Sequence, residues 1–123
     1  MKILVVDDDR YIIEMVNFML EGQGHDIHSF SHVDDAIAAV NDNAFDLIIT
    51  DIVMPDKTGI DFMKYIKIDK GLDTPVLAMT AGMENAVEDY VNHASLYADK
   101  AIAKPLKKEE FIAIVNDLGS ASA

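Results

Sequence analysis

The chain has 123 residues, which fits one domain, and half of them are hydrophobic, which is enough to build a buried core. It has no cysteine for disulfides or thiol chemistry, no apolar stretch near the ~20 residues of a membrane span, and no signal peptide before its first acids, so we expect a cytoplasmic protein with no membrane partner. The formal net charge of -12 argues against nucleic acid as a partner and suits a protein that meets cations or a basic partner, although acids also keep proteins soluble.

Short apolar runs alternate along the chain with stretches of helical period. In chain order, we predict a strand at residues 3–6, a helix at 10–21, a strand at 26–30, a helix at 33–40, a strand at 47–50, a helix at 60–67, a strand at 75–79, a short helix at 87–94, a weak strand at 100–103 and a last helix with its apolar stripe over 111–118. Gly22 and Gly24 end the first helix, and residues 54–59 have turn chemistry. Residues 119–123 are predicted to be a disordered tail, which leaves a single domain over 1–118.

Five strands that alternate with five helices predict an α/β fold. Strands with continuous apolar runs need cover on both faces, and right-handed crossovers then give an open, doubly wound parallel sheet. In this architecture, functional groups gather at the carboxyl ends of the strands.

Polar residues stand at those strand ends. They are Asp7, Asp8 and Asp9 after the first strand, Asp51 after the third, Thr80 after the fourth and Lys104 after the fifth. An Asp after a strand often caps the next helix, and we assign that role to Asp9. A single Thr or Lys in such a place is usually an ordinary surface residue, so the prediction of a site depends on all of them meeting at one edge.

Carboxylates that lie close together repel, at roughly 4 kcal/mol per pair for about 4 Å and an effective dielectric constant near 20. A raised carboxyl pKa relieves this repulsion, and so does a divalent cation such as Mg²⁺, which prefers oxygen ligands. With a cation, an ammonium and a hydroxyl around it, a carboxylate can act as a nucleophile and form an aspartyl phosphate. We therefore predict Asp51 as the nucleophile, Asp7 and Asp8 as metal ligands, and Thr80 and Lys104 as contacts of the phosphoryl oxygens.

Four segments of the chain resemble the receiver domain of bacterial two-component response regulators, of the chemotaxis-receiver type. They are residues 3–9 with the acid pair, 47–55 with the following Gly59, 75–81 with Thr80, and 104–106 with the Lys-Pro pair. Each segment alone is a weak signal, but the four occur in the family's order and span nearly the whole chain.

The resemblance implies a flavodoxin-like sheet with strand order 2-1-3-4-5, and a stand-alone signalling receiver switched by phosphorylation. Asp51 would accept a phosphoryl group from a phosphohistidine on a sensor histidine kinase or a histidine phosphotransfer protein. Thr80 would move toward that group, Lys104 would pair with its oxygens, and the peptide bond before Pro105 would be cis. The Mg²⁺ ligands would be Asp7, Asp8, Asp51 and the backbone carbonyl of Val53.

The resemblance also leads us to expect no enzyme activity beyond phosphoryl transfer to Asp51 and hydrolysis from it. Since no effector domain follows residue 118, we expect output through contact with another protein or onward phosphotransfer, by a monomer or weak dimer. Two residues depart from the family pattern. Ala101 stands where an aromatic switch residue is usual, and Tyr97 stands where glycine is usual; we hypothesise that Tyr97 takes over part of the switch.

Three other functions stay open. A phosphohydrolase of the haloacid-dehalogenase kind would use Asp7 and Asp9 as its acid pair, but Arg10 is unusual after such a pair and a cap domain is missing. A flavodoxin-like FMN binder would need a phosphate loop where this chain has three acids. A degenerate receiver would bind its partner without phosphorylation. The complete set of acids, Thr80 and Lys104 argues against it, and the missing switch aromatic keeps it open.

Overall fold

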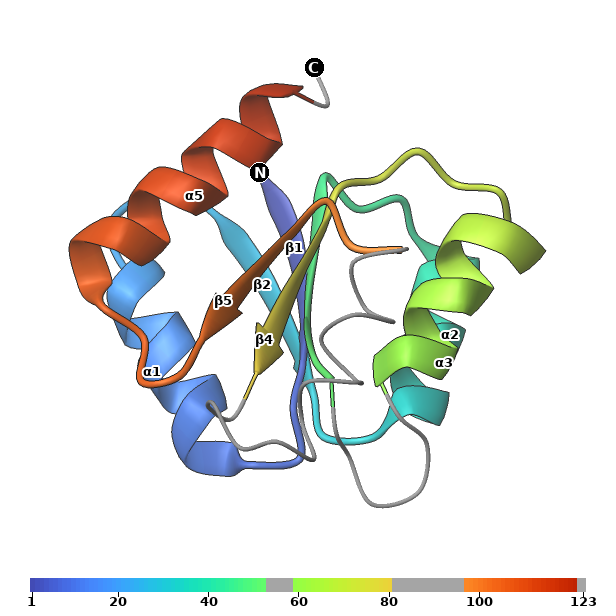
Figure 1. Ribbon diagram of the computed structural model, residues 1–123, viewed down its shortest axis with the longest axis horizontal. Helices are drawn as coiled ribbons and strands as arrows, with labels where there is room; N and C mark the ends of the chain where they lie inside the picture. Colours follow the sequence, from blue (N-terminus) through green and yellow to red (C-terminus); the bar gives the residue numbers. More distant parts are fainter. Residues whose placement is uncertain (53–58, 81–96, 122–123) are drawn as a thin grey trace.

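The computed structural model describes residues 1–52, 59–80 and 97–121 (Figure 1). Its elements, in chain order, are β1 (Lys2–Val6), α1 (Arg10–Leu20), β2 (Asp26–Phe30), α2 (Val33–Asp42), β3 (Leu47–Asp51), α3 (Gly59–Lys64) with a π-helical continuation η1 (Tyr65–Asp69), β4 (Val76–Thr80), β5 (Lys100–Ala103) and α5 (Lys108–Ala121). The predicted helix at 87–94 and most of the predicted loop at 54–59 lie outside the described residues. Within the described ranges, no helix is long and apolar enough to cross a membrane.

The five strands form one parallel sheet in the order β2-β1-β3-β4-β5. Helices α1 and α5 cover one face of this sheet, and α2 and α3 cover the other (Figure 1). The predicted doubly wound fold and its strand order are therefore confirmed.

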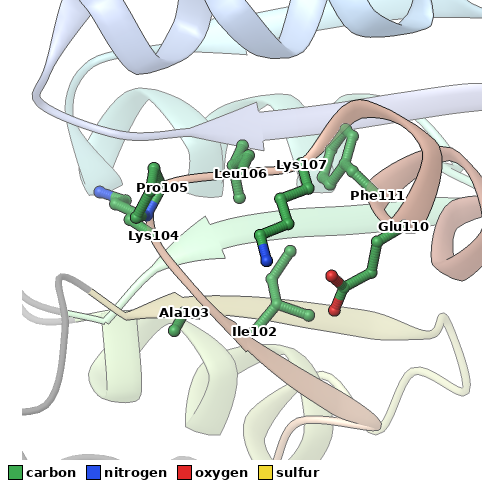
Figure 2. Close-up of a pocket in the computed structure, with 8 residues that line it drawn as sticks. All are labelled: Ile102, Ala103, Lys104, Pro105, Leu106, Lys107, Glu110 and Phe111. Atoms are coloured by element: carbon green, nitrogen blue, oxygen red, sulfur yellow. The ribbon is translucent and has the colours of Figure 1, made fainter.

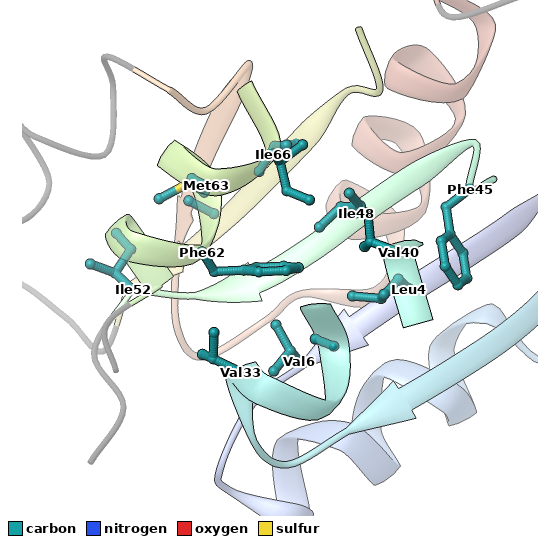
Figure 3. Packing of buried hydrophobic residues seen from close by; sticks show 13 residues of the cluster. Leu4, Val6, Val33, Val40, Phe45, Ile48, Ile52, Phe62, Met63 and Ile66 are labelled. Atoms are coloured by element: carbon teal, nitrogen blue, oxygen red, sulfur yellow. The ribbon is translucent and has the colours of Figure 1, made fainter. Parts of the chain in front are cut away.

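The core has two layers, because alternate residues of each central strand point to opposite faces. Leu4 and Ile48 pack with α2 and α3 (Figure 3), whereas Val5 and Ile49 pack with α1 and α5. Burial of each such side chain contributes about 1.5–3 kcal/mol. Both layers depend on the central strands, which explains why β1 and β3 are buried almost throughout.

Helix α1 begins and ends as the sequence predicts. Asp9 is its N-cap, and the Asp9 carboxylate accepts a hydrogen bond from the backbone N–H of Tyr11 at 2.9 Å. Gly22 and Gly24 adopt φ values of 82° and 80° just after the helix, in the left-handed region that favours glycine. These two glycines allow the chain to make a short turn into β2.

Two helices differ from the prediction. The predicted helix at 60–67 ends in the π-helical turn, which the apolar spacing does not reveal. Helix α5 continues to Ala121, three residues into the tail predicted at 119–123. Gly119 is buried, and a Cβ built on it would overlap the Met1 side chain, so this part of α5 lies against the other end of the chain.

Candidate functional site

The strand order brings four sequence-predicted residues to one edge of the sheet. Asp7 directly follows β1, Asp51 ends β3, Thr80 ends β4, and Lys104 directly follows β5. All the strands are parallel and run toward this edge, so residues up to 97 positions apart in the sequence become neighbours.

Three carboxylates form the centre of the site. Asp7, Asp8 and Asp51 each offer one oxygen atom, and these atoms all lie within 4.8 Å of one another. The Asp7 side chain is fully buried, Asp51 is nearly so, and Asp8 is exposed to solvent. The cluster therefore has two acids in the protein interior and one at its mouth.

The ammonium of Lys104 bridges the two buried acids. Its Nζ lies 3.0 Å from Oδ2 of Asp7 and 3.4 Å from Oδ1 of Asp51. Three carboxylates and one ammonium leave two formal negative charges uncompensated within this group. Any role of the site must account for these two uncompensated negative charges.

Burial and mutual repulsion shift the ionisation of the buried acids. Burial, followed by the charge of Asp7, raises the pKa of Asp51 to about 6, although Lys104 opposes the shift. Burial also raises the pKa of Asp7, against hydrogen bonds from Asp9 and Lys104. Burial would lower the pKa of Lys104, but its two acidic partners raise it above the ordinary value, so Lys104 remains charged.

Backbone groups orient the acids and the lysine. The N–H of Asp9 donates to Oδ1 of Asp7 at 2.8 Å, and the N–H of Ile52 donates to Oδ1 of Asp51 at 2.9 Å. The N–H of Lys104 donates to the carbonyl oxygen of Thr80 at 2.7 Å and so joins the ends of β4 and β5. The Lys104–Pro105 peptide bond is cis, as the resemblance implied.

Thr80 and Val53 complete the predicted set. Thr80 is buried and pairs with Ala103 across β4 and β5. Val53 lies outside the described residues, so its backbone carbonyl stays a prediction.

Two further residues shape the site through the main chain of Asp51. The hydroxyl of Thr50 donates to the Asp51 carbonyl oxygen at 2.9 Å, and a Cβ added to Gly59 would overlap that same oxygen. The sequence places Thr50 in a strand and Gly59 in a loop and assigns neither a role in the site. For Thr50, a signal was present: it is a polar residue in an otherwise apolar buried run.

The two departures from the receiver pattern lie on the same side of the sheet. Tyr97 and Ala101 are both half-buried and pack against the core layer beneath α2 and α3. The small side chain of Ala101 and the larger ring of Tyr97 thus both extend this core layer near the start of β5.

A hollow of about 280 Å³ lies beside this site, lined by residues of β5, the following turn and the start of α5 (Figure 2). Lys104 and Pro105 are at one end of it, and Glu110 and Phe111 are at the other. None of the three clustered carboxylates lines the hollow, so it is separate from the acid cluster.

Residues 3–116 match the response regulator receiver domain family, and the chain belongs to that family. It is similar in structure to the receiver domain of the Francisella response regulator 1452, with a TM-score of 0.85, 29% identity, and coverage of 99% of this chain and 98% of that one. It is also similar to the chemotaxis response regulator CheY4 of Vibrio cholerae, with a TM-score of 0.82, 28% identity, and coverage of 95% and 97%. Phosphorylation-switched signalling is the general function of this family.

Two curated relatives are longer proteins. The chain is 31% identical to the transcriptional regulatory protein DltR of Streptococcus agalactiae over 92% of its own length and 49% of that protein. It is 34% identical to the DNA-binding response regulator MtrA of Mycolicibacterium paratuberculosis over 93% of its own length and 49% of that protein. The chain thus spans about half of each, and the prediction that nucleic acid is not a partner gains no support from these relatives.

Proposed function

We propose that this chain is a phosphorylation switch that accepts a phosphoryl group on Asp51 and signals through protein contact or onward phosphotransfer. One observation carries the proposal: the Asp51 carboxylate lies within 4.8 Å of two further carboxylates and 3.4 Å from the Lys104 ammonium. The donor would be a phosphohistidine on a sensor histidine kinase or a histidine phosphotransfer protein.

The acid cluster fits a resident Mg²⁺. Lys104 compensates only one of three negative charges, and the uncompensated groups are carboxylate oxygens, which this ion prefers. Asp7, Asp8 and Asp51 would hold it, together with the carbonyl of Val53. When bound, Mg²⁺ neutralises the acids and the incoming phosphoryl oxygens, so that an anionic donor can approach.

In the transfer step, a carboxylate oxygen of Asp51 attacks the phosphorus atom. A bond from oxygen to phosphorus forms as the bond from phosphorus to the donor nitrogen breaks, and the nitrogen keeps the electron pair. Lys104, already beside Asp51, pairs with the phosphoryl oxygens, and Thr80 at the end of β4 supplies a hydroxyl to them. The chain would promote only phosphoryl transfer to its own Asp51 and hydrolysis from it.

The decisive experiment combines a small-molecule phosphodonor with Mg²⁺ and measures intact mass. We expect a gain of one phosphoryl group that is labile to hydroxylamine, is absent in Asp51→Asn and disappears without Mg²⁺. A wild-type chain that gains no mass would overturn the proposal and favour a receiver that acts without phosphorylation.

Asp9→Asn is the matched control. Asn caps helices as well as Asp does, so this variant keeps α1 and removes an acid next to the cluster. We expect it to be phosphorylated like the wild type. A phosphohydrolase that used Asp7 and Asp9 would instead be inactivated by this change and would survive Asp51→Asn.

We also propose that Tyr97 contributes to readout of the phosphorylated state. It packs against the same core layer as Ala101, which occupies the position of the usual switch aromatic. Chemical shifts of β5 amides, compared before and after phosphorylation, test this in Tyr97→Ala and Tyr97→Phe. An unchanged response in Tyr97→Ala would exclude Tyr97 from the switch.

A further inference from the structure

Asp51 is held through its backbone as well as through its side chain. The hydroxyl of Thr50 donates to the Asp51 carbonyl oxygen at 2.9 Å. The N–H of Ile52 is shared between Oδ1 of Asp51 at 2.9 Å and the carbonyl of Met79 at 3.1 Å. The Asp51 carbonyl and the Ile52 N–H belong to one planar peptide unit, so the Thr50 hydroxyl and the Asp51 carboxylate contact opposite ends of one rigid group.

The surroundings of Thr50 do not by themselves call for a hydroxyl. Thr50 has no exposed surface, and the residues two positions before and after it, Ile48 in β3 and Ile52 just beyond β3, belong to the apolar core layer. A valine has nearly the same shape, favours strands equally and would bring no buried polar atom. The hydroxyl must therefore be explained by what it touches, and it touches the main chain of Asp51.

Gly59 lies against the same peptide at the Asp51 carbonyl and donates a hydrogen bond to the next carbonyl along the chain. Its N–H donates to the carbonyl of Ile52 at 2.7 Å, and its Cα lies so close to the Asp51 carbonyl that a Cβ would overlap it. The peptide between Asp51 and Ile52 is thus fixed by Thr50, Gly59 and β4, and its N–H in turn orients the carboxylate.

We propose that Thr50 is a positioning residue for phosphorylation of Asp51. Its hydroxyl fixes the peptide that follows Asp51, and this peptide aims the carboxylate at the phosphorus atom. Rates of displacement depend steeply on such alignment, so loss of the hydroxyl slows phosphoryl transfer without removing any reacting group. This inference rests on the proposed function.

Thr50→Val and Thr50→Ser separate the hydroxyl from the shape of the side chain. Val keeps the shape and loses the hydroxyl, whereas Ser keeps the hydroxyl and loses a methyl group. With saturating Mg²⁺ and a small-molecule phosphodonor, we expect Val to slow phosphorylation roughly three- to tenfold, as for loss of one orienting hydrogen bond. We expect Ser to stay within about twofold of the wild-type rate even if it unfolds more easily.

The backbone amide of Ile52 provides a readout that does not depend on turnover. Its proton resonance reports the hydrogen bond to the Asp51 carboxylate, so we expect it to shift in Thr50→Val and to stay near the wild-type position in Thr50→Ser. If Val does not fold, Thr50→Ala and Thr50→Ser give the same comparison, because both lack the methyl group and only Ser has the hydroxyl.

The outcomes are distinct. A slow Val variant with a near-normal Ser variant supports the proposal. A Val variant at the wild-type rate overturns it, and so do Val and Ser variants that slow equally, because packing would then be the cause. If the wild type itself gains no phosphoryl group, the proposed function fails, and the Ile52 resonance alone decides whether Thr50 positions Asp51.

Discussion

At the residue scale, Asp51 carries a charge in an unfavourable place. Asp51 is 6% exposed, and the fully buried carboxylate of Asp7 lies beside it. Such a group is destabilising when ionised and alone, but it becomes favourable once a cation or a covalent partner compensates it. We therefore expect the ionised cluster to destabilise the folded state when no cation is bound.

Replacement of Asp51 by Asn tests whether the ionised carboxylate lowers the stability of the folded state. The pKa of Asp51 is about 6 in the folded protein against 3.8 as the ordinary value, so the folded state holds its proton more tightly. Between about pH 4 and pH 6, the folded state binds more protons than the unfolded state, and this group lowers stability as pH rises. Without metal, we expect Asp51→Asn to be more stable than wild type above pH 6, by at most about 3 kcal/mol, and equally stable near pH 4.

Urea unfolding at pH 4 and pH 7.5 in the presence of a chelator measures the difference. Asp9→Asn serves as the control and should show no comparable gain at pH 7.5. A stability difference between Asp51→Asn and wild type that stays the same at both pH values would contradict the assigned ionisation.

The two buried glycines at helix ends differ in what surrounds them. A Cβ on Gly59 would overlap the Asp51 backbone, whereas a Cβ on Gly119 would meet only the flexible side chain of Met1. We expect Gly59→Ala to cost about 1–3 kcal/mol in unfolding free energy and to slow phosphorylation. We expect Gly119→Ala to change stability by less than about 1 kcal/mol, because Met1 can move and Ala favours helices. Equal losses in the two variants would refute the special role of Gly59.

At the scale of elements, β5 depends on a side chain at its entrance. It has four residues, with its first and last exposed, so it buries less than the central strands. The carboxylate of Asp99 accepts from the N–H of Val76 at 2.7 Å and from Nζ of Lys67 at 3.1 Å. Lys67 also donates to the carbonyl of Thr74 at 2.8 Å. Asp99 therefore ties the start of β5 to the start of β4 and to the π-helical turn.

Asp99→Ala should loosen β5 more than the rest of the sheet. It leaves the N–H of Val76 without its side-chain acceptor, at a cost of about 1–2 kcal/mol. Relative to the wild type, hydrogen exchange of residues 100–103 should accelerate more than hydrogen exchange of β1. Lys67→Met should have a smaller effect, since a partly exposed ion pair contributes about 0–1 kcal/mol. Unchanged exchange in β5 would show that Asp99 does not hold the strand.

At the scale of the whole molecule, acids outnumber bases by 22 to 10, and the cluster at the sheet edge concentrates part of this excess. A cation that binds the folded state alone stabilises it by mass action. We expect Mg²⁺ to raise the melting temperature of the wild type, by an amount that corresponds to about 1.4 kcal/mol at ten times its dissociation constant.

Variants locate the bound ion. Asp8→Asn and Asp51→Asn should lose most of the Mg²⁺ response, whereas Asp9→Asn should keep it, because Asp9 lies outside the cluster and caps α1. An equal rise of the melting temperature in all variants would show that Mg²⁺ screens negative charge in general and does not bind at one site.

The sequence by itself determined the order of the elements and the membership of the acid cluster. Apolar period and glycine positions are local signals, and strands that alternate with helices permit few topologies, so residues at the strand ends had to converge. Asp7, Asp51 and Lys104 could therefore be named together before any contact was known.

Only the tertiary structure decided the features that depend on contacts between distant segments. The raised pKa of Asp51 requires its burial beside Asp7, and the last turn of α5 lies against Met1 from the other end of the chain. The link from Thr50 to the carboxylate runs over neighbouring residues, but its peptide group is held by the Met79 carbonyl of β4 and by the close contact with Gly59. None of these is a property of a local stretch, because each energy arises only when the folded chain excludes water from the contact.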